Sequence, residues 1–151
     1  MSDALLTHLL TIAAQVGDPI SMGISAEGER RMISILGGSV RGRLQGRILP
    51  GGADWQVVRT DGIADIGARY VIETDGGARI EVRSEGYRHG PPEVMARLAR
   101  GDKVDRGEYY FRTLMRFATG DQELAWLNGM LGLAVGERLS HEVRLEVYEV
   151  L

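Results

Sequence analysis

The stretch IADIGARYVIETDGGARIEVRSEG, residues 63–86, predicts a β-hairpin and decides the fold class of the chain. Its flanks alternate apolar and polar side chains, with Tyr70 and Ile72 in the first flank and Ile80 and Val82 in the second. The turn between them begins with Asp75-Gly76, and glycine supplies the positive φ that tight hairpin turns require. The pattern therefore predicts two antiparallel strands.

Further short strands are predicted on both sides of this hairpin. Twenty-one glycines and four prolines are spread along the chain, as is typical of many strands joined by tight turns. Residues 4–16 fit either a helical stripe or an alternating strand, and we favour a strand from about residue 6. The other predicted strands cover residues 19–25, 30–38, 41–52, 108–118, about 124–135 and 141–151.

One short helix is predicted near residues 92–100, in the segment GPPEVMARLARGD. Prolines precede it, Glu93 lies in its first turn, Arg97 and Arg100 lie near its end, and Gly101 stops it. Its apolar residues form one stripe, so it should lie against or cap another element. Many antiparallel strands with one helix and no βαβ rhythm indicate an all-β barrel or sandwich. A closed antiparallel barrel is preferred because closure removes exposed strand edges.

The composition indicates one soluble domain, residues 1–151. The net charge is −3 with both signs interspersed, and no basic stripe of the kind that binds nucleic acid is visible. The absence of cysteine excludes disulfides, zinc ribbons and thiol nucleophiles. The apolar segment 4–16 is too short to cross a bilayer and lacks the basic leader and cleavage site of a signal peptide. A cytoplasmic protein that does not contact a membrane is expected.

Familiar cofactor and nucleophile motifs are not supported. The stretch GGSVRGRLQG, residues 37–46, lacks the strand–helix context of a dinucleotide loop and the Gly-Lys-Ser/Thr of a P-loop. The three histidines, His8, His89 and His141, have no metal-ligand spacing, and no G-x-S-x-G is present. We therefore expect neither a cofactor nor a bound metal.

The run YYFRTLMRF, residues 109–117, presents two arginines on one face of a predicted strand. Tyr110, Arg112, Leu114 and Arg116 share that face. Arginine stays charged in proteins, so a buried Arg112 or Arg116 would need an anionic partner. A salt-bridge cluster, a solvent-facing strand and a pocket for a carboxylate or enolate all remain open, and we predict that Arg112 points into the barrel and pairs with a carboxylate or a bound anion. The acidic side chains available as partners are Asp54, Asp61 and Glu73.

Two tryptophan-containing segments raise a similar choice. In PGGADWQVVRTDG, residues 50–62, Asp54 and Trp55 suit a binding site, although Asp54 could equally cap the turn while Trp55 fills the barrel end. In AWLNG, residues 125–129, a strand would put Trp126 and Asn128 on one face. That pairing could orient a planar ligand or be a packed tryptophan beside a satisfied amide.

The motifs GGSVRGRLQGRILPGGADW, TDG, YYFRT…RF and AWLN, in this order and spacing, resemble the bacterial and fungal family called domain of unknown function 3237, also known as the UPF 0311 proteins. The resemblance covers roughly residues 6–151 and implies a calycin-like antiparallel β-barrel. Arg43 after Gly42 and Met115 before Arg116 depart from the family pattern, where prolines are frequent. The resemblance supports the polar candidates above and assigns them no reaction.

The sequence thus predicts a barrel with a partly polar pocket for a small-molecule ligand. The leading hypothesis is an enzyme that uses cofactor-independent acid–base chemistry (isomerase, cyclase, lyase or hydrolase) on an aromatic, polyketide-like or carboxylate substrate. The alternatives are a non-catalytic carrier and an interaction module that uses LLTHLL; homo-oligomerisation stays open. The catalytic candidates are Asp54, Glu73, Tyr110 and Arg112, and the ligand-binding candidates are Trp55, Asp61, Arg116, Trp126 and Asn128.

Overall fold

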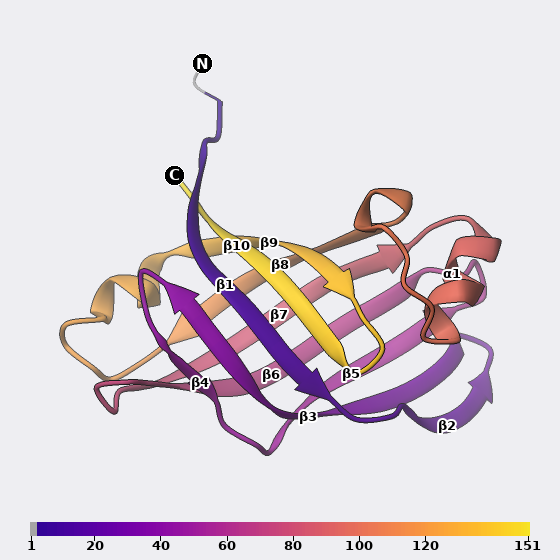
Figure 1. Ribbon diagram of the computed structural model, residues 1–151, viewed down its shortest axis with the longest axis horizontal. Helices are drawn as coiled ribbons and strands as arrows, with labels where there is room; N and C mark the ends of the chain where they lie inside the picture. Colours follow the sequence, from indigo (N-terminus) through magenta and orange to yellow (C-terminus); the bar gives the residue numbers. More distant parts are fainter. Residues whose placement is uncertain (1–2) are drawn as a thin grey trace.

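The computed structural model describes residues 3–151, which form ten strands, one α-helix and two short 3-10 helices (Figure 1). The strands are β1 (Leu6–Val16), β2 (Ile20–Ser25), β3 (Gly28–Gly42), β4 (Gly46–Ile48), β5 (Gly52–Arg59), β6 (Ala64–Thr74), β7 (Arg79–His89), β8 (Tyr110–Ala118), β9 (Leu131–Arg138) and β10 (Glu142–Val150). The helix is α1 (Pro92–Ala99), and the 3-10 helices are η1 (Arg106–Glu108) and η2 (Ala125–Gly129).

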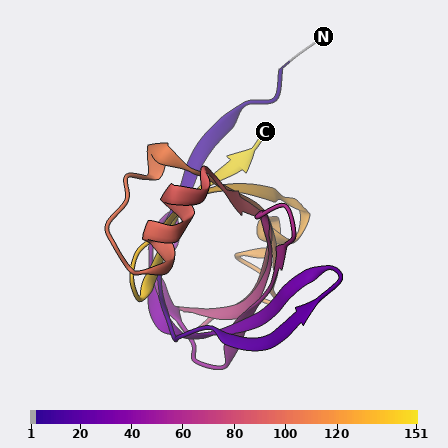
Figure 2. The same ribbon diagram turned by 90° about the vertical axis from the view of Figure 1, so that its right-hand side faces the viewer.

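The strands close into an antiparallel barrel, which confirms the predicted fold class. From β1 the order runs through β10, β9, β8, β7 and β6, and β4 and β5 both join β6 to β3. β3 then pairs with β1 and completes the ring, which Figure 2 shows nearly end-on. β2 pairs with β3 as a hairpin that projects from the wall.

Closure depends on close approach of the backbones of β1 and β3. Gly38 of β3 has φ +140° and lies opposite Ala14 of β1. A Cβ at Gly38 would stand 2.1 Å from the carbonyl oxygen of Ala13. Only glycine fits this position, because both the positive φ and the close contact exclude a side chain.

The hydrophobic core fills the barrel with alternate residues of each strand. The quoted hairpin pairs as expected, Tyr70 with Val82 and Ile72 with Ile80, and all four side chains are buried. The inward face of β7 continues from Val82 through Ser84 to Arg88, so it becomes polar toward its end. The end of β7 leads into α1, and the polar part of the interior therefore lies toward the helix-bearing end of the barrel (Figure 1).

The strand predicted for residues 124–135 is wrong in its first half. Residues Ala125–Gly129 form η2, and β9 begins only at Leu131. The apolar residues Leu124, Leu127 and Met130 recur every third position, which is the period of a 3-10 helix. Leu127 and Met130 are buried and Leu124 packs against the core, so the tertiary contact selects this period over the alternating one.

Other boundaries agree with the sequence in part. Segment 4–16 is a strand as favoured, and the short helix forms where expected. Within residues 41–52, β3 continues to Gly42, β4 covers only Gly46–Ile48, and β5 starts at Gly52. β2 is a strand, yet its alternating Ile20, Met22 and Ile24 are all exposed rather than part of the core. No helix within residues 3–151 has both the length and the hydropathy needed to cross a membrane.

Candidate ligand site inside the barrel

A cavity runs from the helix-bearing mouth of the barrel into its interior. The outer part, about 420 Å³, lies between α1 and the strand ends; Met95 and Leu98 of the helix form one wall. The inner part, about 50 Å³, lies among the core side chains. Ile33, Arg88 and Arg138 line both parts, so the two are connected at these residues.

Arg88 is the most unusual side chain of this cavity. It is only 6% exposed, and its guanidinium carbon lies 5.3 Å from the centre of the Phe111 ring. No ion pair or side-chain hydrogen bond formed within residues 3–151 includes it, although buried charges are ordinarily paired. Burial, followed by repulsion from Arg31 and Arg138, lowers the pKa of Arg88 to about 10. It remains a cation at neutral pH and faces the cavity without an anionic partner from the described part of the chain.

Two more arginines add positive charge at the mouth, where the acidic residues Asp18 and Glu29 also line the outer cavity. Arg31 of β3 and Arg138 of β9 are half-buried and line the outer cavity beside Arg88. Burial is the main cause that lowers the pKa of both guanidinium groups, and Arg31 further lowers the pKa of Arg138 by repulsion. Three cations converging on one partly desolvated space form a binding site for an anion.

Asp54 is the acidic group of the site, and a defined chain of hydrogen bonds holds it. Arg31 Nε donates to Gln56 Oε1 (2.9 Å), and Gln56 Nε2 donates to Asp54 Oδ2 (2.6 Å). Since arginine can only donate, the amide of Gln56 must present its nitrogen to Asp54. The other oxygen, Oδ1, accepts from the backbone N–H of Gly67 (3.2 Å). The carboxylate is therefore fixed in orientation on the inner wall.

Burial raises the pKa of Asp54 above its ordinary value of 3.8, against the opposing effects of Gln56, Arg88, Gly67 and Arg31. A carboxyl group with a raised pKa gives up and takes back a proton more readily near neutral pH than an exposed one. Because such groups cluster at functional sites, Asp54 beside the buried Arg88 marks this cavity as the candidate site.

The hydroxyl groups of Tyr70, Ser84 and Thr113 line the inner part of the cavity. Ser84 Oγ donates to Thr113 Oγ1 across β7 and β8 (2.8 Å). The hydroxyl of Tyr70 is buried and has no hydrogen-bond partner within residues 3–151. The cavity is therefore positive at its mouth and carries neutral hydrogen-bonding groups at its inner end.

The expectation that Arg112 points into the barrel is wrong. The inward face of β8 is Phe111, Thr113, Met115 and Phe117, whereas Tyr110, Arg112, Leu114 and Arg116 lie on the outer surface. Arg112 Nη1 donates to the carbonyl of Phe111 (3.0 Å), and its guanidinium lies over the Tyr110 ring. The outer face is partly apolar, and this is why alternation alone did not identify the inner one.

Three other candidates also lie outside the cavity. Trp55 is 57% exposed on the outer face of β5. Asp61 accepts from the N–H of Ile63 (3.1 Å) and pairs with Arg59, so it belongs to the β5–β6 turn. Glu73 forms surface ion pairs with Arg47 and Arg79, whose hydrogen bonds lower its pKa. The structure therefore does not bring Trp55, Asp61 or Glu73 into one site with Asp54.

Trp126 and Asn128 lie in η2, at the end of the barrel remote from α1 (Figure 1). Asn128 accepts from the N–H of Thr119 (2.8 Å) and donates to its carbonyl (3.0 Å), so it fastens the loop between β8 and η2. The guanidinium of Arg43 lies over the Trp126 ring at 4.2 Å. The expected shared strand face is therefore absent, and the ligand roles of these residues stay predictions.

The structure thus brings Asp54 alone of the sequence candidates into the cavity. The residues that reasoning from sequence missed are Arg31, Gln56, Tyr70, Ser84, Arg88, Thr113 and Arg138. A signal existed for two of them. Arg88 continues the face of Ile80 and Val82 by strict alternation, and Gln56 stands two positions after Asp54. Within residues 3–151 there is no cluster of three or more His, Asp or Glu that could hold a metal ion.

Known proteins match this chain over nearly its whole length. The family model described as "Protein of unknown function (DUF3237)" matches residues 5–150. The chain therefore belongs to the DUF3237 family, whose members are also called UPF0311 proteins. A UPF0311 protein of Bradyrhizobium diazoefficiens is 39% identical over 144 residues, 95% of both chains.

Solved structures agree with the fold. A conserved protein of unknown function from Rhodopseudomonas palustris superposes with a TM-score of 0.94 at 39% identity, covering 100% of this chain and 99% of that one. A β-barrel-like protein from Acinetobacter baumannii gives 0.87 at 38% identity, covering 100% and 98%. A protein of Penicillium herquei described as an enzyme shares the fold, with a TM-score of 0.75 at 17% identity, covering 100% and 97%.

Proposed function

We propose that the protein is a small-molecule enzyme that carries out cofactor-independent acid–base chemistry on an anionic organic substrate in the barrel cavity. The observation that carries the proposal is the buried Arg88, which faces the cavity with no anionic partner among residues 3–151. An unpaired buried cation destabilises the fold, so its retention is explained by a ligand that supplies the missing negative charge.

In this proposal Arg88 binds an anionic oxygen of the substrate, such as a carboxylate or an enolate. Arg31 and Arg138 add positive potential at the mouth, which favours entry of anions and strengthens their binding in a space of low dielectric. Ile33 and the helix residues Met95 and Leu98 give the cavity an apolar wall for the carbon skeleton. The preferred substrate class is therefore an organic anion with an aromatic or other apolar body.

Asp54 transfers the proton. Its raised pKa suits a group that removes a proton from a carbon or oxygen acid and returns it during the same turnover. The chain Arg31–Gln56–Asp54 fixes the carboxylate, so little reorganisation is needed when the substrate binds. The family to which the chain belongs has no stated activity, and the enzyme described from Penicillium herquei supports catalysis only as an analogy of fold.

A non-catalytic carrier is the second candidate, and a specific observation favours it. Both oxygens of Asp54 already accept a hydrogen bond, one from Gln56 and the other from Gly67. In a carrier, a carboxylate engaged in this way would orient Arg31 and shape the cavity without exchanging a proton. The two functions share the anion site at Arg88 and differ in whether Asp54 exchanges a proton with the ligand.

The anion site is tested by titrating the full chain with benzoate and with benzamide, followed by NMR. We expect benzoate to bind at least ten times more tightly, since a charge-assisted hydrogen bond contributes about 1.5–3 kcal/mol. Arg88→Met should abolish the preference, and Arg112→Met, on the outer face, should leave it unchanged. Equal affinities for the two probes, or a preference that survives Arg88→Met, would overturn the proposal.

Catalysis is tested with 4-acetylbenzoate in D₂O, by following deuterium incorporation into its methyl group. Asp54 would remove a methyl proton, the electron pair of the C–H bond would form a C=C bond, and the π pair of the ketone would move to its oxygen. The carbon of the resulting enolate would then take a deuteron from the exchanged Asp54 carboxyl group. We expect the protein to speed up exchange of the methyl protons above the rate in buffer alone. Asp54→Asn should remove this increase. Binding without exchange would reject the enzyme and leave the carrier.

A further inference from the structure

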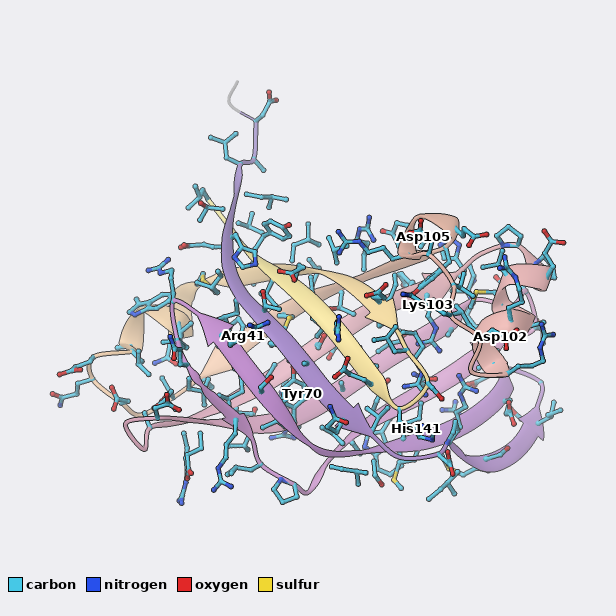
Figure 3. All side chains as sticks on the ribbon, viewed as in Figure 1. Arg41, Tyr70, Asp102, Lys103, Asp105 and His141 are labelled. Atoms are coloured by element: carbon cyan, nitrogen blue, oxygen red, sulfur yellow. The ribbon has the colours of Figure 1, made fainter. Side chains whose placement is uncertain are left out.

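The hydroxyl of Tyr70 is a buried polar group for which the described part of the fold offers no partner. Tyr70 lies in β6, is 4% exposed and pairs across the sheet with Val82. Its hydroxyl oxygen has no hydrogen bond within residues 3–151, and it is the one fully enclosed side-chain polar atom of that region without a hydrogen-bond partner, whereas the Arg88 guanidinium borders the cavity. Figure 3 places Tyr70 over the middle of the barrel, away from the end that carries α1.

The polar groups around Tyr70 do not supply a hydrogen-bond partner for its hydroxyl. Asp54 is near enough to act on its pKa, yet its carboxylate oxygens accept hydrogen bonds from Gln56 and Gly67 and none from the Tyr70 hydroxyl. The hydroxyl groups of Ser84 and Thr113 are hydrogen-bonded to each other. Burial, and then the charge of Asp54, raises the pKa of Tyr70 above its ordinary range, so the group stays protonated and presents an O–H donor.

Tyr70 lines the inner cavity of about 50 Å³, so its hydroxyl donor lies beside this space. A buried hydroxyl without a partner destabilises the folded protein, and phenylalanine would fill nearly the same volume without that penalty. Phenylalanine would therefore suit a purely structural role better. The hydroxyl fits a space that is occupied, during function, by a hydrogen-bond acceptor.

We propose that the ligand of the cavity carries a second oxygen, a carbonyl or ether-type acceptor, at its inner end and that the Tyr70 hydroxyl binds it. The inference rests on the proposed function, since Arg88 holds the anionic end of the same molecule at the mouth. The site thus selects oxygenated organic anions, such as keto acids or acylated aromatic acids. An anion with a purely hydrocarbon inner end leaves the Tyr70 donor unpaired and binds more weakly.

The test compares 4-acetylbenzoate with 4-isopropenylbenzoate, which have nearly the same shape and differ in a carbonyl oxygen against a CH₂ group. NMR titration of the full chain should show the acetyl compound binding about 5–10 times more tightly, as expected for one buried hydrogen bond. Tyr70→Phe should weaken the acetyl compound to the level of the isopropenyl compound and leave the latter unchanged. Tyr87→Phe, at an exposed tyrosine on the outer face of β7, is the matched control and should change neither affinity.

The outcomes separate this inference from the proposed function. If both probes bind through Arg88 with equal affinity, or if Tyr70→Phe weakens both alike, the second-oxygen proposal is wrong and the anion site stands. If neither probe shows binding that Arg88→Met removes, the proposed function fails, and this inference fails with it.

Thermal unfolding without ligand supplies an independent readout. Tyr70→Phe should keep or raise the melting temperature, because it removes an unpaired buried hydroxyl and leaves the packing of the ring unchanged. A melting temperature lowered by several degrees would show that the hydroxyl serves the ligand-free protein, through an ordered water held in the cavity. That result would overturn the ligand role of Tyr70.

Discussion

Arg88 and Arg112 lie on neighbouring strands and differ completely in surroundings. Arg112 stands opposite Tyr87 in the β7–β8 ladder, one residue before Arg88 along β7. Since successive side chains alternate between the two faces of a sheet, Tyr87 and Arg112 lie outside while Arg88 lies inside. A one-residue difference in position therefore separates a solvated surface arginine from a buried one that faces a cavity.

Substituting each arginine with methionine should expose this difference in stability. Methionine keeps much of the side-chain volume and removes the charge. We expect Arg88→Met to leave the free energy of unfolding unchanged or to raise it by up to about 2 kcal/mol, because it removes an unpaired buried charge. Arg112→Met should change it by less than about 0.5 kcal/mol. Urea unfolding measures both. A loss above about 3 kcal/mol for Arg88→Met would instead indicate a structural ion cluster.

Asp54 should give the stability of the protein a distinct dependence on pH. Its folded-state pKa is raised by burial, so the native state holds this proton more tightly than the unfolded state does. The contribution of Asp54 is therefore most favourable in acid and declines as pH rises from about 4 through the raised folded-state pKa. A tenfold difference in proton affinity between the two states corresponds to about 1.4 kcal/mol. The unfolding free energy of wild type minus that of Asp54→Asn should therefore decrease as pH rises.

Glu73 provides a control of opposite sign. Its pKa is lowered by hydrogen bonds from Arg47 and Arg79, so its contribution is present above its ordinary pKa of 4.5 and is lost as pH falls. The unfolding free energy of wild type minus that of Glu73→Gln should therefore increase as pH rises. If the two variants showed slopes of the same sign, the environment assigned to Asp54 would be wrong.

At the scale of elements, the contact between β1 and β3 closes the barrel and brings the polar ends of β3, β7 and β9 around one mouth. α1 completes the outer wall of the cavity there, since Val94 and Leu98 are buried against the barrel while Met95 and Leu98 line the cavity. The segment from Asp18 to Pro19 and the turn at Ser140 and His141 complete the rim. The site consequently depends on closure, and Ala14, Val16 and Ile35 of the closing contact themselves line the inner cavity.

Gly38→Ala should disrupt that contact. The added Cβ would meet the carbonyl of Ala13 and would also be strained at φ +140°. We expect a loss of at least about 2–3 kcal/mol in unfolding free energy, or no folded protein, because backbone strain and overpacking act together. Gly120→Ala is the control: nothing lies within 4 Å of its added Cβ, and a change below about 0.5 kcal/mol is expected. Equal effects of the two substitutions in thermal unfolding would contradict the close approach.

At the scale of the whole molecule, the core supplies the stability without any visible need for cross-links or ions. Buried apolar residues from every barrel strand except β5 form one continuous cluster, and the chain contains no cysteine. A domain of about 150 residues buries close to 70% of the surface that its unfolded chain exposes, which is enough to fold without a disulfide or structural metal.

Removal of metal should therefore leave the protein unchanged. We expect elemental analysis of the purified protein to find far less than one equivalent of any transition metal, since residues 3–151 offer no cluster of three metal-ligating side chains. Addition of a chelator should not shift the melting temperature. One bound metal per chain, together with stability lost on chelation, would prove this prediction wrong.

Local pattern was sufficient for most of the secondary structure. Period-two alternation predicted the hairpin of β6 and β7, and proline, charge and glycine placement predicted α1, because these signals act within a few residues. It failed for η2, where packing of Leu127 selected a 3-10 period; it predicted β2 as a strand but not that the apolar side chains of β2 face solvent. Family motifs added the closed barrel, which alternation by itself could not distinguish from a sandwich.

The site was decided by tertiary structure. Alternation divides a strand into two faces and does not say which one is inside when both carry apolar residues, as in β8. Arg31, Asp54, Arg88 and Arg138 come from four strands, and only closure of the barrel brings them to one cavity. The sequence by itself determined the strands and the inward Asp54 as a candidate. Long-range pairing determined its partners, because the distance between strands far apart in the chain depends on the register and closure of the whole sheet.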